Sequence, residues 1–191
     1  MEQGYNAEVS VGFVYAPITT LGYGKRVGVW FSGCCKNCKD CVTPEFKRFN
    51  YCGITAKQII EYVVKKLRDE KMDGLTVSGG EPFEQIEFLE SLVAETKKYT
   101  DDILVYTGYT LESLMDKKDK RVENIIEKIG VIIDGEYIDE LNDGKPLRGS
   151  SNQKIIILNN ALKGKYERLF REKRKTEIIT VGKRIISIGI K

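Results

Sequence analysis

The residues best suited to chemistry are five cysteines gathered in one short stretch: Cys34, Cys35, Cys38, Cys41 and Cys52. A disulfide framework would spread its cysteines along the chain, and an odd number leaves one thiol unpaired. The first ten residues are mixed and polar, unlike a signal peptide. We therefore expect a cytoplasmic protein whose thiols stay reduced.

Cys34, Cys38 and Cys41 have the spacing C-x3-C-x2-C, which leaves three interpretations open. Zinc sites generally take four ligands, and the chain has no second cysteine pair and no histidine. Redox C-x-x-C chemistry would use only Cys38 and Cys41. Ordinary cluster proteins supply four cysteines, so three thiolates on one loop favour a [4Fe–4S] cluster with one iron free for a non-protein ligand. Zinc and incidental thiols remain the alternatives.

Cys35 and Cys52 are the remaining candidates for a fourth ligand. Cys35 directly follows Cys34, and adjacent side chains rarely point the same way; Cys52 lies beyond a loop. We expect each of them to be a free thiol.

The composition restricts the other chemistry. The chain has 191 residues, 31 Lys plus Arg, 28 Asp plus Glu and no histidine. This length suits a single domain over residues 1–191, and the charge balance favours neither nucleic acid nor membrane. No apolar run approaches the about 18 residues of a membrane span. The absence of histidine excludes Ser-His-Asp triads, Cys-His dyads and histidine general bases.

Strand and helix patterns alternate along most of the chain. The predicted strands are residues 27–31, 75–77, 103–106, 131–133 and 154–158. The predicted helices are residues 59–67 after a capping box at 55–58, then 84–99, 111–115, 122–129 and 162–170. Residues 177–181 and 184–190 form a predicted hairpin. This alternation predicts an α/β fold with a parallel sheet and right-handed crossovers.

The unusual loops all follow predicted strands. They are residues 34–41, 78–82, 107–109, 134–135 and 159–160. Because the carboxyl ends of parallel strands line one edge of a sheet, we expect these loops to converge on a single site.

The cysteine spacing, together with Ser78-Gly79-Gly80-Glu81-Pro82, resembles the radical S-adenosylmethionine (SAM) superfamily. Residues 26–34 look like the lead-in of the small glycyl-radical activating enzymes. Three further segments resemble the anaerobic ribonucleoside-triphosphate reductase activating proteins in particular: residues 105–109, 134–138 and 148–153. These motifs extend from about residue 22 to 153. Asp40 stands where these activators often have glycine.

The resemblance implies a partial, open (β/α) barrel, because a closed eight-stranded barrel typically needs ~250 residues. It implies a [4Fe–4S] cluster on Cys34, Cys38 and Cys41, with SAM on the open iron. Reductive cleavage would give a 5′-deoxyadenosyl radical, and the chain would be a radical SAM oxidoreductase. Its substrate would be a glycine of a large anaerobic ribonucleotide reductase. Two alternatives remain: modification of a ribosomally made precursor peptide, and a non-enzymatic iron–sulfur or zinc module.

The resemblance also indicates SAM-binding residues. Gly79 and Gly80 let the backbone approach a ligand closely, with Ser78 beside them. Glu81 would fix the turn or contact the ligand indirectly, unless the segment is merely a turn between strand and helix.

Four more residues complete this candidate set. Asp40 and Val42 flank Cys41, and their backbone should line the adenine side. Thr107 could bond the ribose. Arg148 is either a cation near the carboxylate of SAM or the carboxyl terminus of a partner, or part of a hydrogen-bonded strand entry.

The C-terminal region is basic. Its cations are Lys163, Lys165, Arg168, Arg171, Lys173, Arg174 and Lys175. A solvated helix face is the first interpretation, and docking of an acidic flavodoxin or ferredoxin electron donor is the second. Nucleic-acid binding is the weakest interpretation, because few aromatic residues are interleaved with these cations.

The cysteine assignment gives a direct prediction. Anaerobically purified protein should hold about four irons and four sulfides per chain. Replacing Cys34, Cys38 or Cys41 with Ala should abolish the cluster in an iron and sulfide assay, whereas Cys35→Ala and Cys52→Ala should keep it. Stoichiometric zinc without iron would contradict the assignment.

Overall fold

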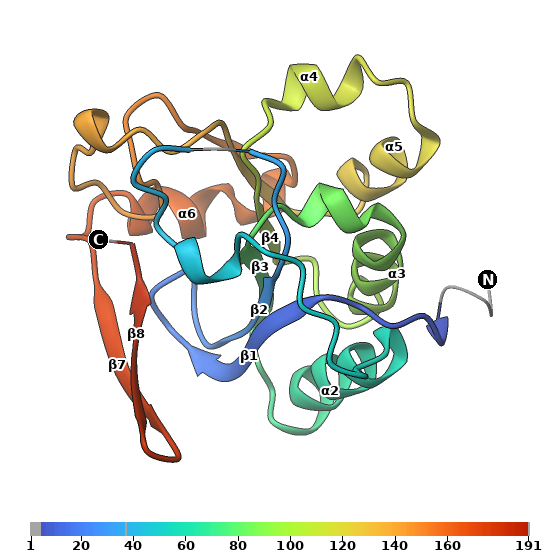
Figure 1. Ribbon diagram of the computed structural model, residues 1–191. Helices are drawn as coiled ribbons and strands as arrows, with labels where there is room; N and C mark the ends of the chain where they lie inside the picture. Colours follow the sequence, from blue (N-terminus) through green and yellow to red (C-terminus); the bar gives the residue numbers. More distant parts are fainter. Residues whose placement is uncertain (1–4, 37, 191) are drawn as a thin grey trace.

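The computed structural model describes residues 5–36 and 38–190 and contains a six-stranded mixed sheet (Figure 1). The strands lie in chain order: β1 (Val11–Ile18), β2 (Arg26–Phe31), β3 (Gly74–Gly79), β4 (Ile103–Tyr106), β5 (Val131–Asp134) and β6 (Lys154–Ile157). Strands β2 to β5 are parallel, while β1 and β6 pair antiparallel at the two edges. The predicted α/β class with a largely parallel sheet is therefore confirmed.

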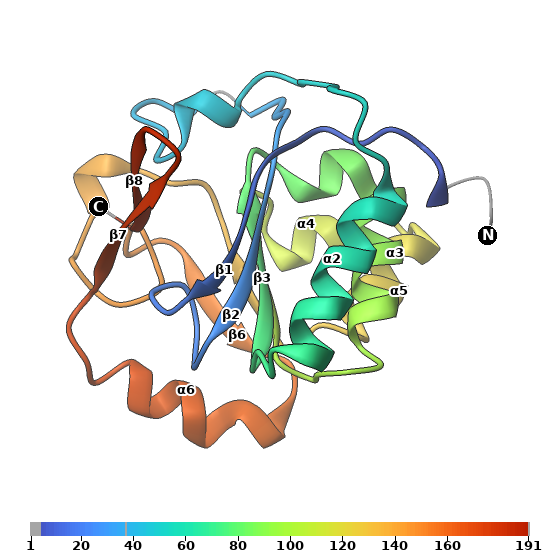
Figure 2. The same ribbon diagram turned by 90° about the horizontal axis from the view of Figure 1, so that it is seen from below.

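Four helices cover one face of this sheet, as Figure 2 shows. They are α2 (Ala56–Asp69), α3 (Ile86–Thr96), α4 (Leu111–Met115) and α5 (Lys120–Ile126). Helix α6 (Lys163–Leu169) and a separate hairpin of β7 (Thr176–Val181) and β8 (Arg184–Gly189) lie on the other side. Short 3-10 helices connect these elements: η1 (Pro44–Phe46), η2 (Pro82–Gln85), η3 (Asp139–Leu141) and η4 (Asn160–Leu162).

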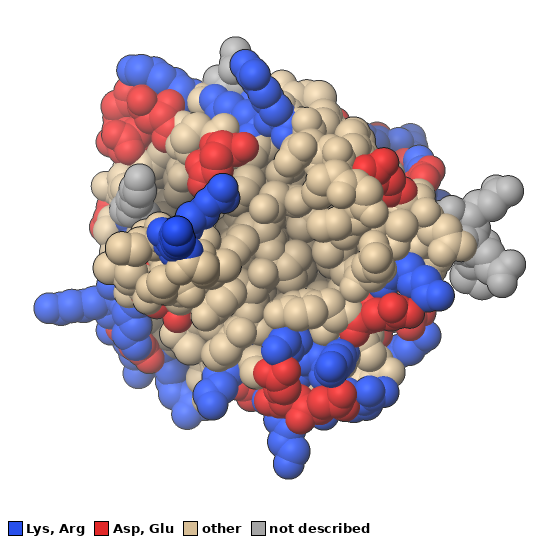
Figure 3. Space-filling model, turned by 60° about the horizontal axis from the view of Figure 1, so that its bottom comes forward, with Lys and Arg blue, Asp and Glu red and all other residues tan. Residues whose placement is uncertain are grey.

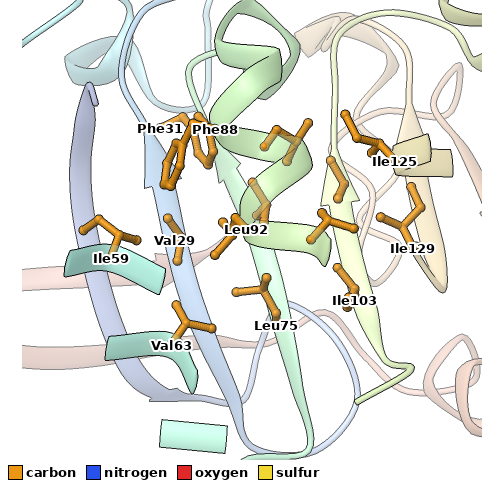
Figure 4. Packing of buried hydrophobic residues seen from close by; sticks show 14 of the residues in the cluster. Val29, Phe31, Ile59, Val63, Leu75, Phe88, Leu92, Ile103, Ile125 and Ile129 are labelled. Carbon is orange, nitrogen blue, oxygen red and sulfur yellow. The ribbon is translucent and has the colours of Figure 1, made fainter. Parts of the chain in front are cut away.

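The main core lies between the parallel strands and helices α2, α3 and α5 (Figure 4). Phe31 of β2 stacks on Phe88 of α3, with ring centroids 4.8 Å apart. Helix α2 begins with the predicted capping box, in which Thr55 and Gln58 each bond the other's backbone N–H. Because side chains alternate along a strand, Leu104 faces the opposite side and packs against Tyr166 of α6.

Strand β6 corrects one prediction about the site. Only the 3-10 helix η3 lies between β5 and β6, and no α-helical crossover connects them. A parallel pair needs such a crossover, so β6 returns antiparallel to β5. Asn159 and Asn160, which follow β6, consequently lie at the opposite edge from the loops that follow β3, β4 and β5. The residues that precede β6, up to Gln153, take their place.

Two element predictions also differ from the structure. Strand β1 was not predicted, because its residues are mostly half-buried and lack a clean alternation. The helix predicted over residues 84–99 is divided into η2 and α3 and ends at Thr96. The single domain predicted over 1–191 includes residues 1–4, 37 and 191, which lie outside the described residues. None of the described helices is long and apolar enough to cross a bilayer.

A buried ion pair lies at the amino ends of the parallel strands, opposite the candidate site. The guanidinium of Arg26 lies 2.9 Å from the carboxylate of Asp102 and donates to the hydroxyl of Thr76 at 2.6 Å. The hydroxyl of Tyr166 donates to the same Asp102 carboxylate at 2.6 Å. These bonds connect β2, β3 and α6 through groups that water does not reach.

Replacing Asp102 with Asn should destabilise the fold by about 3–5 kcal/mol, because Arg26 would keep a buried and unpaired charge. The free energy of unfolding, measured in denaturant, tests this. The matched control is Asp101→Asn, which removes only the exposed pair with Lys97 and should cost under about 1 kcal/mol. Equal losses in the two variants would contradict the assigned role of the pair.

Candidate active site

The loops at the carboxyl edge of the parallel strands surround a cavity of about 750 Å³. Residues from the cysteine segment and from the loops after β3, β4 and β5 line it, as predicted. In Figure 3 the middle of one face is hollowed and largely uncharged, with Lys, Arg, Asp and Glu gathered around it. The cavity volume lies within the range of roughly 300–1,000 Å³ that is typical of small-molecule sites.

Three of the five cysteines share this cavity. Cys34, Cys38 and Cys41 line it, whereas Cys35 and Cys52 are exposed and are not among its lining residues. The thiol of Cys35 instead donates to the Glu84 carboxylate at 3.4 Å. The structure thus separates the C-x3-C-x2-C thiols from the other two.

Backbone bonds hold the cysteine segment in place. The Gly33 and Cys34 N–H groups donate to the carbonyls of Phe46 and Lys47, at 2.8 and 3.0 Å. The Lys47 ammonium then donates to the Cys38 carbonyl at 3.1 Å. The segment is therefore anchored on both sides of its first cysteine.

The number of thiols in the cavity fits a [4Fe–4S] cluster. Three thiolates of one segment leave one iron of such a cluster for a non-protein ligand, whereas a structural zinc site takes four protein ligands. Burial raises the pKa of the Cys34 thiol to about 11 and also raises that of Cys38. Metal binding therefore has to displace protons from these thiols.

Gly79 and Gly80 bring two backbone segments into close contact. Gly79 has a φ of +106°, which favours glycine, and its carbonyl accepts from the Thr43 hydroxyl at 2.9 Å. A β-carbon on Gly80 would lie 2.4 Å from the Gly33 carbonyl oxygen and 2.8 Å from that of Phe46. The atoms nearest to such a β-carbon thus belong to the backbone that carries the cysteines, while Gly80 also lines the cavity and its contact with SAM stays a prediction.

Glu81 joins the loops after β3 and β4. Its buried carboxylate accepts from the Thr107 hydroxyl at 2.8 Å, the Gly108 N–H at 2.8 Å and the Phe83 N–H at 3.1 Å. Burial raises the pKa of Glu81 to about 6, and these three donors oppose that rise. The Thr107 hydroxyl also accepts from the Tyr109 N–H at 3.1 Å. Thr107 lines the cavity, but its hydroxyl is already committed to Glu81, and its bond to a ribose stays a prediction.

The remaining predicted site residues divide into two groups. Val42 and Ser78 line the cavity, whereas Asp40 and Arg148 are not among its lining residues. Asp40 is exposed and has a φ of +58°, a conformation that glycine adopts freely and Asp tolerates.

Arg148 is not a lining residue of the cavity. Its guanidinium is paired with Asp143, and its carbonyl accepts from Arg174 at 2.6 Å. Of its own loop, Gly149 and Gln153 reach the cavity. These contacts favour the hydrogen-bonded strand entry, and a role of Arg148 toward SAM or a partner stays a prediction.

Sequence reasoning missed two parts of the site. Lys36 lies in the cavity wall, 2.9 Å from the Glu136 carboxylate and 4.2 Å from the ring centroid of Tyr109. Its position between the first two cysteines was the available signal. Strand β8 also forms part of the wall, and no local pattern could bring a segment about 150 residues away to the cysteines.

Comparison with known proteins agrees with this geometry. The family described as "4Fe-4S single cluster domain" matches residues 20–156. The anaerobic ribonucleoside-triphosphate reductase-activating protein of Haemophilus influenzae is 35% identical over 150 residues, covering 74% of this chain and 94% of that protein. Its Escherichia coli K12 counterpart is 29% identical over 149 residues, with the same coverage, and that of phage T4 is 29% identical over 138 residues, covering 70% and 85%.

This chain belongs to the family of anaerobic ribonucleoside-triphosphate reductase-activating proteins. Membership confirms the predicted cofactors, a [4Fe–4S] cluster and SAM, and the predicted class, a radical SAM oxidoreductase. The match to the cluster family ends at residue 156, so α6 and the β7–β8 hairpin lie beyond it, although β8 lines the same cavity.

The close backbone contact at Gly80 gives a prediction. Gly80→Ala should destabilise the protein by about 1–3 kcal/mol, because the new methyl group would push against the Gly33 and Phe46 carbonyls. Cluster content and SAM affinity should fall together, as measured by iron analysis and equilibrium binding. Gly164→Ala is the control, since its β-carbon meets no atom within 4 Å. Unchanged cluster content in Gly80→Ala would show that the loop tolerates a side chain.

Proposed function

We propose that this chain activates an anaerobic ribonucleoside-triphosphate reductase by generating a glycyl radical on it at the expense of SAM. The observation that carries the proposal is the shared cavity, in which three cysteines of one segment meet the Gly79–Gly80 backbone. The names of the relatives support the choice of reductase.

The cysteine and glycine segments have distinct roles in this proposal. Cys34, Cys38 and Cys41 would hold the cluster, and the segment from Ser78 to Glu81 would bind SAM with Val42 and the backbone of Asp40. With one electron from a donor, the bound cluster and SAM would supply methionine and a 5′-deoxyadenosyl radical, and this radical would take a hydrogen atom from a glycine Cα of the partner to give 5′-deoxyadenosine.

The residues of the chain position this chemistry and keep water out. Glu81 fixes the ends of β3 and β4 relative to each other through Thr107 and Gly108. Trp30 and Tyr106 contribute aromatic surface to the cavity wall, which limits the access of water to a reactive radical. Hydrogen-atom abstraction needs no general base, which agrees with a chain that has no histidine.

The finer architecture belongs to the same proposal. Four parallel strands with antiparallel edges at β1 and β6 form a sheet with two free edges among the described residues. We interpret it as a partial (β/α) barrel in one radical SAM domain, whose open side admits a macromolecular substrate. A cytoplasmic location agrees with reduced thiols. Modification of a precursor peptide has no observation in its favour.

A flavodoxin or ferredoxin is the proposed electron donor. The basic C-terminal residues support it only in part, because Lys163 and Lys175 pair with Glu167 and Glu172 on the same surface. Such pairing is typical of a solvated face.

The proposed function has a direct test. Reduced holoprotein, SAM and the anaerobic reductase of the same cell should give a doublet glycyl-radical signal in electron paramagnetic resonance, with about one 5′-deoxyadenosine per radical. Cys38→Ala, and a reductase whose target glycine is replaced by alanine, should give no signal. A covalently altered short peptide, with no radical on the reductase, would refute the proposal.

A further inference from the structure

The β7–β8 hairpin forms one wall of the cavity. Residues 184–190 all line it, together with the three cysteines of the C-x3-C-x2-C segment. On its inner face Ile188 and Ile190 are buried against Ile18, Leu21 and Trp30. A molecule that enters the cavity therefore passes beside this hairpin.

Polar bonds fasten the hairpin to the body of the protein. The carboxylate of Glu177 in β7 accepts from the Thr19 N–H at 2.8 Å and from the hydroxyls of Thr19 and Thr20, each at 3.1 Å. Together with the buried isoleucines, these bonds place the hairpin before any partner binds. A preorganised surface loses less conformational entropy on binding than a mobile one.

The outer face of the hairpin carries two exposed isoleucines between short polar side chains. Ile178 faces Ser187 and Ile185 faces Thr180 across the two strands, so all four residues share the face opposite Ile188. Ile178 and Ile185 are 74% and 78% exposed. No other strand of the described chain pairs with β7 or β8, and the Ile188 carbonyl of β8 accepts one bond from the body of the protein, from the Thr20 hydroxyl at 3.4 Å. Exposed apolar side chains beside an open strand edge favour an extended peptide partner.

We propose that this outer face (Ile178, Thr180, Ile185 and Ser187) is the docking surface for the reductase segment that carries the target glycine. The inference rests on the proposed function. A glycine within a polypeptide reaches the cavity only as part of a main chain, and β8 is both a wall of the cavity and an open edge. A chain that runs along β8 finds backbone N–H and C=O partners at that edge and leads into the cavity.

The position of β8 at the cavity wall supports this choice of occupant. The hairpin lies beyond residue 156, where the match to the cluster family ends, so it is an addition to the part of the chain that this family shares. A second copy of this chain seated on the same face would stand at the cavity wall and compete with the substrate.

The experiment compares binding of the reductase to anaerobic holoprotein variants. Ile178→Ser is the informative change, because Ile178 is exposed and is not a lining residue of the cavity. The variant lacks the isoleucine side chain that bound reductase would bury, so the affinity for reductase should weaken about tenfold or more. Met115→Ser on α4, which removes another exposed apolar side chain far from the hairpin, should leave the affinity and the radical yield unchanged. Reductase should also slow amide hydrogen exchange in residues 176–189 but not in 111–115.

The outcomes separate the two proposals. If wild-type protein forms the radical, but Ile178→Ser binds reductase equally well and the hairpin gains no protection, the docking surface is wrong and the proposed function stands. If wild-type protein forms no radical on the reductase, the proposed function itself fails. If Ile178→Ser converts a dimer to a monomer without changing the affinity for reductase, the face belongs to a second copy, and the docking proposal is overturned.

Discussion

The buried carboxylate of Glu81 is the interaction on which the site depends most. Burying a carboxylate is unfavourable unless hydrogen bonds replace its hydration, and here the Thr107 hydroxyl and two backbone N–H groups do so. These hydrogen bonds do not fully offset the loss of hydration, since burial still raises the pKa of Glu81 to about 6. The same bonds set the distance between the ends of β3 and β4. The backbone of the same loop is bonded directly to the segment that leads into the cysteines, from the Gly80 N–H to the Phe31 carbonyl at 2.7 Å and from the Glu81 N–H to the Gly33 carbonyl at 2.9 Å.

The direction of the strands explains why so many loops reach this point. Four parallel strands end at one edge and deliver the residues after β2, β3, β4 and β5 to one cavity. The antiparallel β6 then brings in Gly149 and Gln153 from its beginning instead of its end. At the amino ends of the strands, away from the cavity, the Arg26–Asp102 pair holds β2 next to the residues that lead into β4. The buried ion pair and the candidate site thus lie at opposite ends of the parallel strands.

Local patterns predicted much of this arrangement, because they depend on neighbouring residues. The capping box at Thr55 and strand β4 follow from such short-range rules. The meeting of the cysteine segment with the loop after β3 follows from the shared direction of parallel strands. The misplaced Asn159–Asn160 loop and the place of Arg148 depended on the direction of β6 and on a partner such as Asp143. The wall formed by β8 depended on tertiary packing of Ile188 against Trp30, which no sequence window contains.

The central claim is that the three thiolates of one segment would hold a cluster and leave its fourth iron to SAM. Mössbauer spectroscopy of ⁵⁷Fe-labelled holoprotein, with and without SAM, tests it most directly. The account predicts that about one quarter of the iron gives a separate Mössbauer signal. This signal should change when SAM is added, while the signal of the remaining iron stays the same. Four equivalent irons that do not respond to SAM would contradict it, because a fourth protein ligand would then occupy the place assigned to SAM.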